Sequence, residues 1–290
     1  MATIEKIPAF HEEHKLDDDA REEENATSLP DKKENRRLRR KVDLRLVPAL
    51  GLMYAVSLMD RSNLPNASIA GMRADLGLSV GYRYSLVALC FFITYTLFQS
   101  PATILCRIVG PRYFLPGICV AWGMLIVGFG FAQSWHTLVA LRVILGLLEA
   151  GYFPGCVYVM STWYTRYHVA KRYSVFYLIG NLGSAFSNIL AYGLMQMDGL
   201  GGVRGWQWIF IMEGLFTVTV SLVAFVLMIR FPDEEVKKPS KMFLNPEETK
   251  HVIAELNKDR GDVDPESFSW AKFLKPARDV EIWGFAFIMM

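Results

Sequence analysis

Six long apolar runs, separated by short polar segments, dominate the middle of the chain. A helix that crosses a bilayer needs about 20 mostly apolar residues, and each run reaches that length. The pattern therefore predicts six membrane-spanning helices, near residues 46–67, 84–105, 113–132, 137–160, 174–196 and 207–229. A further apolar run starts at Ile282 and reaches Met290, and we interpret residues 282–290 as the start of a truncated seventh span.

Two polar regions flank the six runs. Residues 1–45 alternate acidic and basic side chains and lack the apolar segment of a cleaved signal, so we expect a disordered cytosolic tail. Residues 230–281 read as a central cytosolic loop. Within it, Asn245 followed by Pro246 and two glutamates is typical of a helix start, and it predicts a short amphipathic helix.

The distribution of charge narrows the class of protein. Of the 60 charged side chains, 23 lie in residues 1–45 and 22 in residues 230–281, which leaves 15 for the 184 residues between them. A soluble surface carries about a quarter charged residues, so this middle region needs a lipid environment. The composition excludes a soluble enzyme, a nucleic-acid-binding protein and a secreted disulfide scaffold.

Neither cysteines nor histidines assemble a reactive or metal-binding pattern. The four cysteines lie in or beside apolar runs without a CxxC spacing, and the five histidines are scattered through tails and loops. We therefore expect no metal, no cofactor and no enzymatic activity.

Basic residues gather at alternate ends of the spans, as the positive-inside rule requires for a cytosolic N-terminus. Beyond the arginine-rich segment 36–45, these residues are Arg107, Arg112, Arg166, Lys171 and Arg172. We interpret them as topology anchors, and the alternative that they form gating bridges to helix ends stays open.

Five ionisable residues fall well inside the predicted spans: Asp60, Arg61, Arg142, Glu149 and Glu213. Each costs at least about 2.5 kcal/mol at the middle of a membrane helix. Arg142 and Glu149 are seven residues apart, so a regular helix places them on one face. Two arginines beside two carboxyl groups suit an anion site next to protonatable groups. The alternatives are static bridges among the first four, and for Glu213 a structural role near the outer interface.

Several strings resemble the major facilitator superfamily. They are Asp60-Arg61-Ser62-Asn63, RVILGLLEAGYFPG at residues 142–155, Ser161-Thr162-Trp163-Tyr164, Ala170-Lys171-Arg172 and GWQWIFIMEG at residues 205–214. Within that superfamily the strings look like the anion:cation symporter branch, in particular the fungal allantoate, nicotinate and pantothenate permease group. The resemblance covers about residues 40–290, and departures at Pro65, Gln99 and Thr103 bear on substrate identity.

The resemblance implies a twelve-helix fold made of two six-helix bundles, of which this chain carries the N-terminal bundle. It also implies that Arg61 and Arg142 form the substrate-binding pair, and that Asp60 and Glu149 exchange protons. Arg61 would bind the substrate carboxylate, and Arg142 would hold Glu149 and couple it to the substrate. Gly110-Pro111-Arg112 would lie in a loop that helps gating. Location in the plasma membrane is implied by the resemblance as well.

The leading hypothesis is a secondary active transporter that moves a small organic anion together with protons by alternating access. Its partners would be that anion, protons and the lipid bilayer, with no nucleic acid. The alternative is a truncated half-transporter that does not transport by itself and associates with or modulates a full-length partner. Its motivation is the apolar bundle face that a missing second bundle leaves uncovered.

Overall fold

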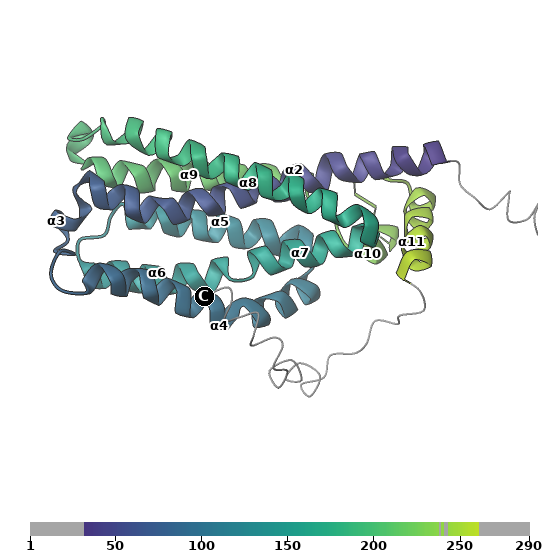
Figure 1. The fold of residues 1–290 in the computed structure, drawn as a ribbon, viewed down its shortest axis with the longest axis horizontal. Coiled ribbons are helices and arrows are strands. Elements are labelled where there is room, and N and C mark those ends of the chain that lie inside the picture. Colours follow the sequence, from purple (N-terminus) through teal and green to yellow (C-terminus); the bar gives the residue numbers. More distant parts are fainter. Residues whose placement is uncertain (1–31, 238, 241–242, 261–290) are drawn as a thin grey trace, which may run out of the picture.

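The computed structural model describes residues 32–237, 239–240 and 243–260, and this part of the chain is a bundle of long helices without a strand (Figure 1). Six helical segments in it are long and apolar enough to cross a membrane. They confirm the six predicted spans, and they are α2 (Lys32–Ala67), α4 (Arg83–Val109), α5 (Pro111–Phe129), α6 (Trp135–Glu149) with α7 (Tyr152–Trp163), α8 (Arg166–Met195) and α9 (Gly205–Leu227).

Shorter helices lie at the two ends of the bundle. The end that holds α10 (Pro232–Lys237), α11 (Pro246–Arg260) and the first turns of α2 is called the charged end below (Figure 1). The opposite end carries the π-helical turn η1 (Ser68–Met72), the short helix α3 (Arg73–Asp75) and the 3-10 turn η2 (Leu200–Gly202).

The first helix begins earlier than the sequence pattern indicates. Residues 32–45 were expected in a disordered tail, but they are helical and continue directly into the first span. Leu38 and Val42 are buried, Lys41 pairs with Glu248 of α11, and Asp43 pairs with Arg172 of α8. These contacts stabilise a segment whose composition alone is typical of disorder. Residues 1–31 lie outside the described residues.

The spans pack in pairs, with α2 against α8 and α9, α5 against α9, and α4 against α6. Small residues allow the close approach. A Cβ atom added at Gly183 of α8 would lie 2.5 Å from the Cβ of Ala55 in α2, and one added at Gly214 of α9 would lie 2.7 Å from the backbone nitrogen of Val127 in α5. Side chains larger than hydrogen at these two positions would push the helices apart.

The fourth span is interrupted between α6 and α7, at Ala150 and Gly151. Pro154 has no backbone N–H to donate to the carbonyl of Ala150, and this explains a break at that point. The interruption falls directly after Glu149, one of the candidate residues.

The amphipathic helix predicted after Asn245 is present as α11. It buries Val252 and Leu256, and the Glu248 carboxylate accepts a hydrogen bond from the Asn245 backbone amide at 2.9 Å, as in the second half of a capping box. The remainder of the predicted central loop and the expected seventh span at 282–290 lie outside the described residues.

Candidate functional site

Two of the predicted residues form an ion pair at the centre of the bundle. Nε of Arg61 in α2 lies 3.0 Å from Oε1 of Glu149 in α6, and the hydroxyl of Ser57, one helical turn before Arg61, also donates to that oxygen. The Arg61 guanidinium lies over the ring of Tyr95 in α4, 4.9 Å from its centroid. A third of the Arg61 side chain is exposed, whereas Glu149 is buried. The pair therefore joins a buried carboxylate to an accessible cation.

Asp60 occupies a different environment from its neighbour in sequence. Its carboxylate is buried and accepts hydrogen bonds only from neutral donors: the Trp122 indole at 3.1 Å, the Thr217 hydroxyl at 3.3 Å and the Asn63 amide at 3.4 Å. Among the described residues no arginine or lysine pairs with it. Asp60 thus ties α2 to α5 and α9 through uncharged groups.

Arg142 lies on the same helix as Glu149, but the two form no ion pair in the described part of the chain. The Arg142 guanidinium lies over two rings, 5.3 Å from the centroid of Phe129 and 5.9 Å from that of Phe91, and its buried Nε has no hydrogen-bond partner there. The resemblance implied that Arg142 holds Glu149. In the structure the partner of Glu149 is Arg61.

Glu213 of α9 belongs to the same cluster. It is 1% exposed, and its charge lies within electrostatic range of Asp60. Neither carboxylate oxygen has a partner at ordinary hydrogen-bond distance and angle in the described residues, although the side chains of Asn63 and Ser187 lie close by. Oε2 of Glu149 likewise lacks a partner there. The cluster therefore contains three carboxyl groups and two arginines, with polar capacity left unused.

Ser57 and Thr217 contribute to the cluster but are not among the residues that the sequence pattern singles out. Ser57 precedes Arg61 by four residues and Thr217 follows Glu213 by four, so each shares a helix face with a candidate charge. That spacing is the only signal by which the sequence marks them, because hydroxyl groups are common in membrane helices.

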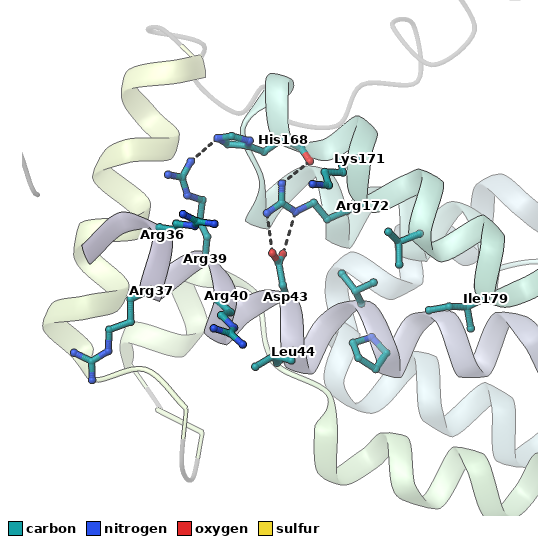
Figure 2. Close-up of a pocket in the computed structure, with 13 residues that line it drawn as sticks. Arg36, Arg37, Arg39, Arg40, Asp43, Leu44, His168, Lys171, Arg172 and Ile179 are labelled. Carbon is teal, nitrogen blue, oxygen red and sulfur yellow. Dashed lines mark hydrogen bonds and ion pairs between the residues drawn. The ribbon is translucent and has the colours of Figure 1, made fainter. Parts of the chain in front are cut away.

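The residues predicted as anchors or gates all lie at the charged end. Arg172 donates to both carboxylate oxygens of Asp43, at 3.0 and 2.7 Å (Figure 2), and Arg112 donates to the Ser240 hydroxyl at 2.6 Å. The backbone amide of Arg166 donates to Asp259 of α11 at 2.9 Å. The first contact joins α8 to α2, and the other two hold the segment after α10 and helix α11 against the ends of the spans.

The other predicted members of this group differ in their contacts. Arg107 lies over the ring of Tyr158, 5.4 Å from the centroid, and Lys171 lines a basic cavity described below. Gly110 links α4 to α5 with a φ of 88°, a left-handed conformation that favours glycine. In the part of the chain that the structure describes, no group of three or more His, Cys, Asp or Glu is placed to hold a metal ion.

A helical membrane bundle with ionisable side chains at its centre is the architecture of a membrane transport protein. A family model makes the assignment specific: that of the Major Facilitator Superfamily matches residues 50–290. The chain belongs to this family.

Fungal transporters are among its relatives. The chain is 34% identical to the MFS-type transporter cnsO of Penicillium expansum over 84% of this chain and 47% of that protein. It is 32% identical to the high-affinity nicotinic acid transporter of Saccharomyces cerevisiae over 87% of this chain and 45% of the relative. The chain spans about half the length of the curated relatives it matches.

Solved structures support the fold. A bacterial homolog of the human lysosomal transporter Spinster, in an inward-facing and occupied conformation, superposes with a TM-score of 0.55 at 19% identity, over 64% of this chain and 44% of that one. At that identity the likeness concerns the arrangement of helices.

Proposed function

We propose that this bundle takes part in the coupled transport of a small organic anion and protons by alternating access. One observation carries the proposal: the partly exposed Arg61 is paired, at 3.0 Å, with the buried Glu149. A planar guanidinium is suited to bind a carboxylate with two hydrogen bonds, and its present partner is itself a carboxylate.

This pairing suggests how substrate and proton are coupled. A substrate carboxylate and Glu149 compete for Arg61, and protonation of Glu149 removes its charge and frees the guanidinium for substrate. Asp60 and Arg142 sit within the same electrostatic environment, so we assign Asp60 as a second proton-exchanging group. We assign Arg142 to balance the charge of Glu149 at longer range rather than in direct contact.

The substrate class follows from the same chemistry. A planar aromatic carboxylate would stack near Tyr95 while its carboxylate meets Arg61, and one relative is named for the transport of nicotinic acid. We therefore propose a small monocarboxylate as the substrate. From the basic residues at alternate span ends we also propose a cytosolic N-terminus, and from the family resemblance a location in the plasma membrane.

The test uses the full-length transporter that contains this bundle, reconstituted in proteoliposomes with an imposed pH gradient and radiolabelled nicotinate as the probe. We expect Arg61→Ala to abolish uptake, and Glu149→Gln to lose accumulation driven by protons while it still exchanges substrate. Lys250→Ala, on the exposed face of α11, serves as the control with normal uptake. Normal accumulation by both cluster variants would contradict the proposal.

A second candidate is a half-transporter that associates with or modulates a full-length partner. It is favoured by the outward faces of α4 and α8, which expose large apolar side chains such as Leu97, Phe98 and Leu182 together with the polar side chains of Thr96, Ser100 and Asn181. Exposed polar groups within a span suit contact with a second bundle or a water-filled cavity better than contact with acyl chains. Co-purification of the tagged 290-residue chain with a full-length relative would support this candidate, and an active homodimer of the chain would contradict it.

A further inference from the structure

A basic groove lies at the charged end, between the first turns of α2 and the start of α8 (Figure 2). It encloses a cavity of about 1060 Å³. Its cationic lining comes from both helices: Arg36, Arg39 and Arg40 from α2, and Lys171 and Arg172 from α8. Figure 2 shows Arg37 pointing away from the others.

Part of this positive charge is already neutralised. Arg172 is held by the single acidic residue of the lining, Asp43, at 3.0 and 2.7 Å. Arg39 contacts His168 and lies 3.6 Å from Glu255 of α11. Within the described ranges, Arg36, Arg40 and Lys171 have no ion pair, and all three are exposed. The groove thus presents three uncompensated cations to an anionic ligand.

The floor of the groove is apolar and leads toward the middle of the bundle. Leu44, Val47 and Val175 follow the basic residues, and then Ile179. Ile179 also lines a second cavity of about 480 Å³, where α2 contributes Leu52 and Met59 and α8 contributes Phe186. The two cavities follow one another between α2 and α8 and share Ile179 in their linings. Together they are called the slot below, charged at one end and apolar along the rest.

The apolar part of the slot is long enough for an acyl chain in one leaflet of a membrane. From Leu44 to Met59, α2 rises roughly 22 Å at 1.5 Å per residue, and half the hydrocarbon core of a bilayer is about 15 Å. Basic clusters next to a membrane span are also the usual sites of attraction for anionic lipids.

We propose that this slot binds an anionic phospholipid. The headgroup phosphate lies among Arg36, Arg40 and Lys171, and one acyl chain lies along Ile179 and Phe186. A free phosphate would leave the apolar part empty. The acidic segment at residues 11–24 of this chain matches the charge, but Leu16 is its only large aliphatic residue. Its sequence therefore suits the apolar part less well than an acyl chain does.

The experiment is native mass spectrometry of the purified 290-residue chain titrated with phosphatidylserine or phosphatidylcholine. We expect at least a tenfold preference for phosphatidylserine, since each Lys or Arg near an anionic headgroup contributes about fivefold or more in affinity. The triple variant Arg36→Gln/Arg40→Gln/Lys171→Gln should lose this preference. The control Lys237→Gln/Lys250→Gln/Lys258→Gln removes three exposed charges of the same end outside the groove and should retain it.

A second variant tests the apolar part of the slot. Phe186→Ala should weaken phosphatidylserine binding about threefold, by removal of apolar contact area. Phe98→Ala, on α4 and outside the slot, should leave it unchanged; Phe98 is 41% exposed and Phe186 65%. Equal binding by wild type and the triple variant would overturn the proposal.

Two further outcomes identify other occupants, and each would overturn the lipid assignment. If glycerophosphoserine, the headgroup without acyl chains, displaces the lipid at equal concentration, the site is one for soluble anions. If Asp17→Asn/Asp18→Asn/Asp19→Asn raises lipid affinity tenfold or more, the acidic segment is the resident occupant. Because none of these measurements involves transport, their result is independent of the proposed function.

Discussion

Ion pairs occur at two depths of this bundle, and they are built differently. At the charged end two carboxylates are fully engaged: Asp43 accepts two hydrogen bonds from Arg172, and Glu248 accepts from Lys41 at 2.8 and 3.1 Å. At the centre, Oε2 of Glu149 and both oxygens of Glu213 lack partners among the described residues. The same residue types therefore stabilise the contacts between helix ends at the charged end, whereas at the centre some of their oxygens remain free, within the described part of the chain, to accept hydrogen bonds.

The two kinds of pair differ in how much the free energy of unfolding changes when one partner is lost. A partly exposed pair in contact with water contributes little, because water solvates either partner when the pair is broken. A buried pair contributes more when one partner is lost, because the other is left without compensation. The comparison can be tested by removing one member at each depth.

The largest effect is expected from Glu149→Ala. It leaves Arg61 and the buried Arg142 with less compensation, and we expect the free energy of unfolding to fall by about 3 kcal/mol, the lower end of the range for a buried pair because Arg61 keeps part of its exposure. Reversible unfolding by sodium dodecyl sulfate in mixed micelles measures it. The control Lys250→Ala should change the free energy of unfolding negligibly. A loss below about 1 kcal/mol in Glu149→Ala would contradict the expectation that the central pair contributes more to stability than the pairs at the charged end.

The positions of the central charges also depend on the contact between α4 and α6. A Cβ atom at Gly146 would overlap the Thr94 hydroxyl and lie 2.6 Å from the Phe91 carbonyl oxygen, so Gly146→Ala should cost about 1–3 kcal/mol through overpacking. The matched control is Gly193→Ala, because no atom lies within 4 Å of a Cβ added there. Equal stability of the two variants in the same unfolding assay would show that the close approach is dispensable.

At the charged end, Asp43→Asn and Arg172→Ala should each cost about 1 kcal/mol, since the pair is bidentate yet partly exposed, at 33% and 14% of the side chains. A double-mutant cycle isolates their coupling. A coupling as large as the effect of Glu149→Ala would mean that burial does not separate the two regions.

The smallest effect concerns pH. Burial alone would raise the pKa of Glu248, but hydrogen bonds from Lys41 and from the Asn245 amide outweigh it and hold the pKa below its usual value. A carboxyl group with a lowered pKa stabilises the folded state above its unfolded pKa of about 4.3, and this contribution is lost as pH falls through the folded pKa. We expect a few tenths of a kcal/mol.

Unfolding of wild type and Glu248→Gln as a function of pH measures this contribution. Their difference in stability should be constant above about pH 5 and should shrink below about pH 4, near the unfolded pKa. A difference that grows on acidification would have the wrong sign for this pair.

Much of the fold follows from the sequence because the bilayer imposes length and composition on each span. The helix period likewise predicts that Arg142 and Glu149 share a face. The helix period does not predict that Glu149 pairs with Arg61. This contact depends on the position of α2 along its axis relative to α6, which the pattern of a single helix does not contain. Two of the neutral donors to Asp60, Trp122 and Thr217, come from α5 and α9. They are far from Asp60 in sequence, so only the packed bundle reveals them.

The helix at residues 32–45 shows a second structural feature that the sequence does not predict. Composition predicts how a segment behaves in water when it is isolated from the rest of the chain. An arginine-rich stretch with few apolar residues is then expected to be disordered. Here Leu38 and Val42 are buried, and Lys41 and Asp43 find partners on α11 and α8. Long-range pairing of this kind leaves no periodic signal in the sequence.

The hydrogen bond between the Trp122 indole and Asp60 gives the bundle an internal optical probe. Indole emission depends on the charge that its N–H group faces, so a change in the protonation of Asp60 would shift the emission of a fully buried fluorophore. The difference spectrum between wild type and Trp122→Phe isolates this signal from the other six tryptophans. Fluorescence as a function of pH can then test whether Asp60 binds a proton, without a label and without a substrate.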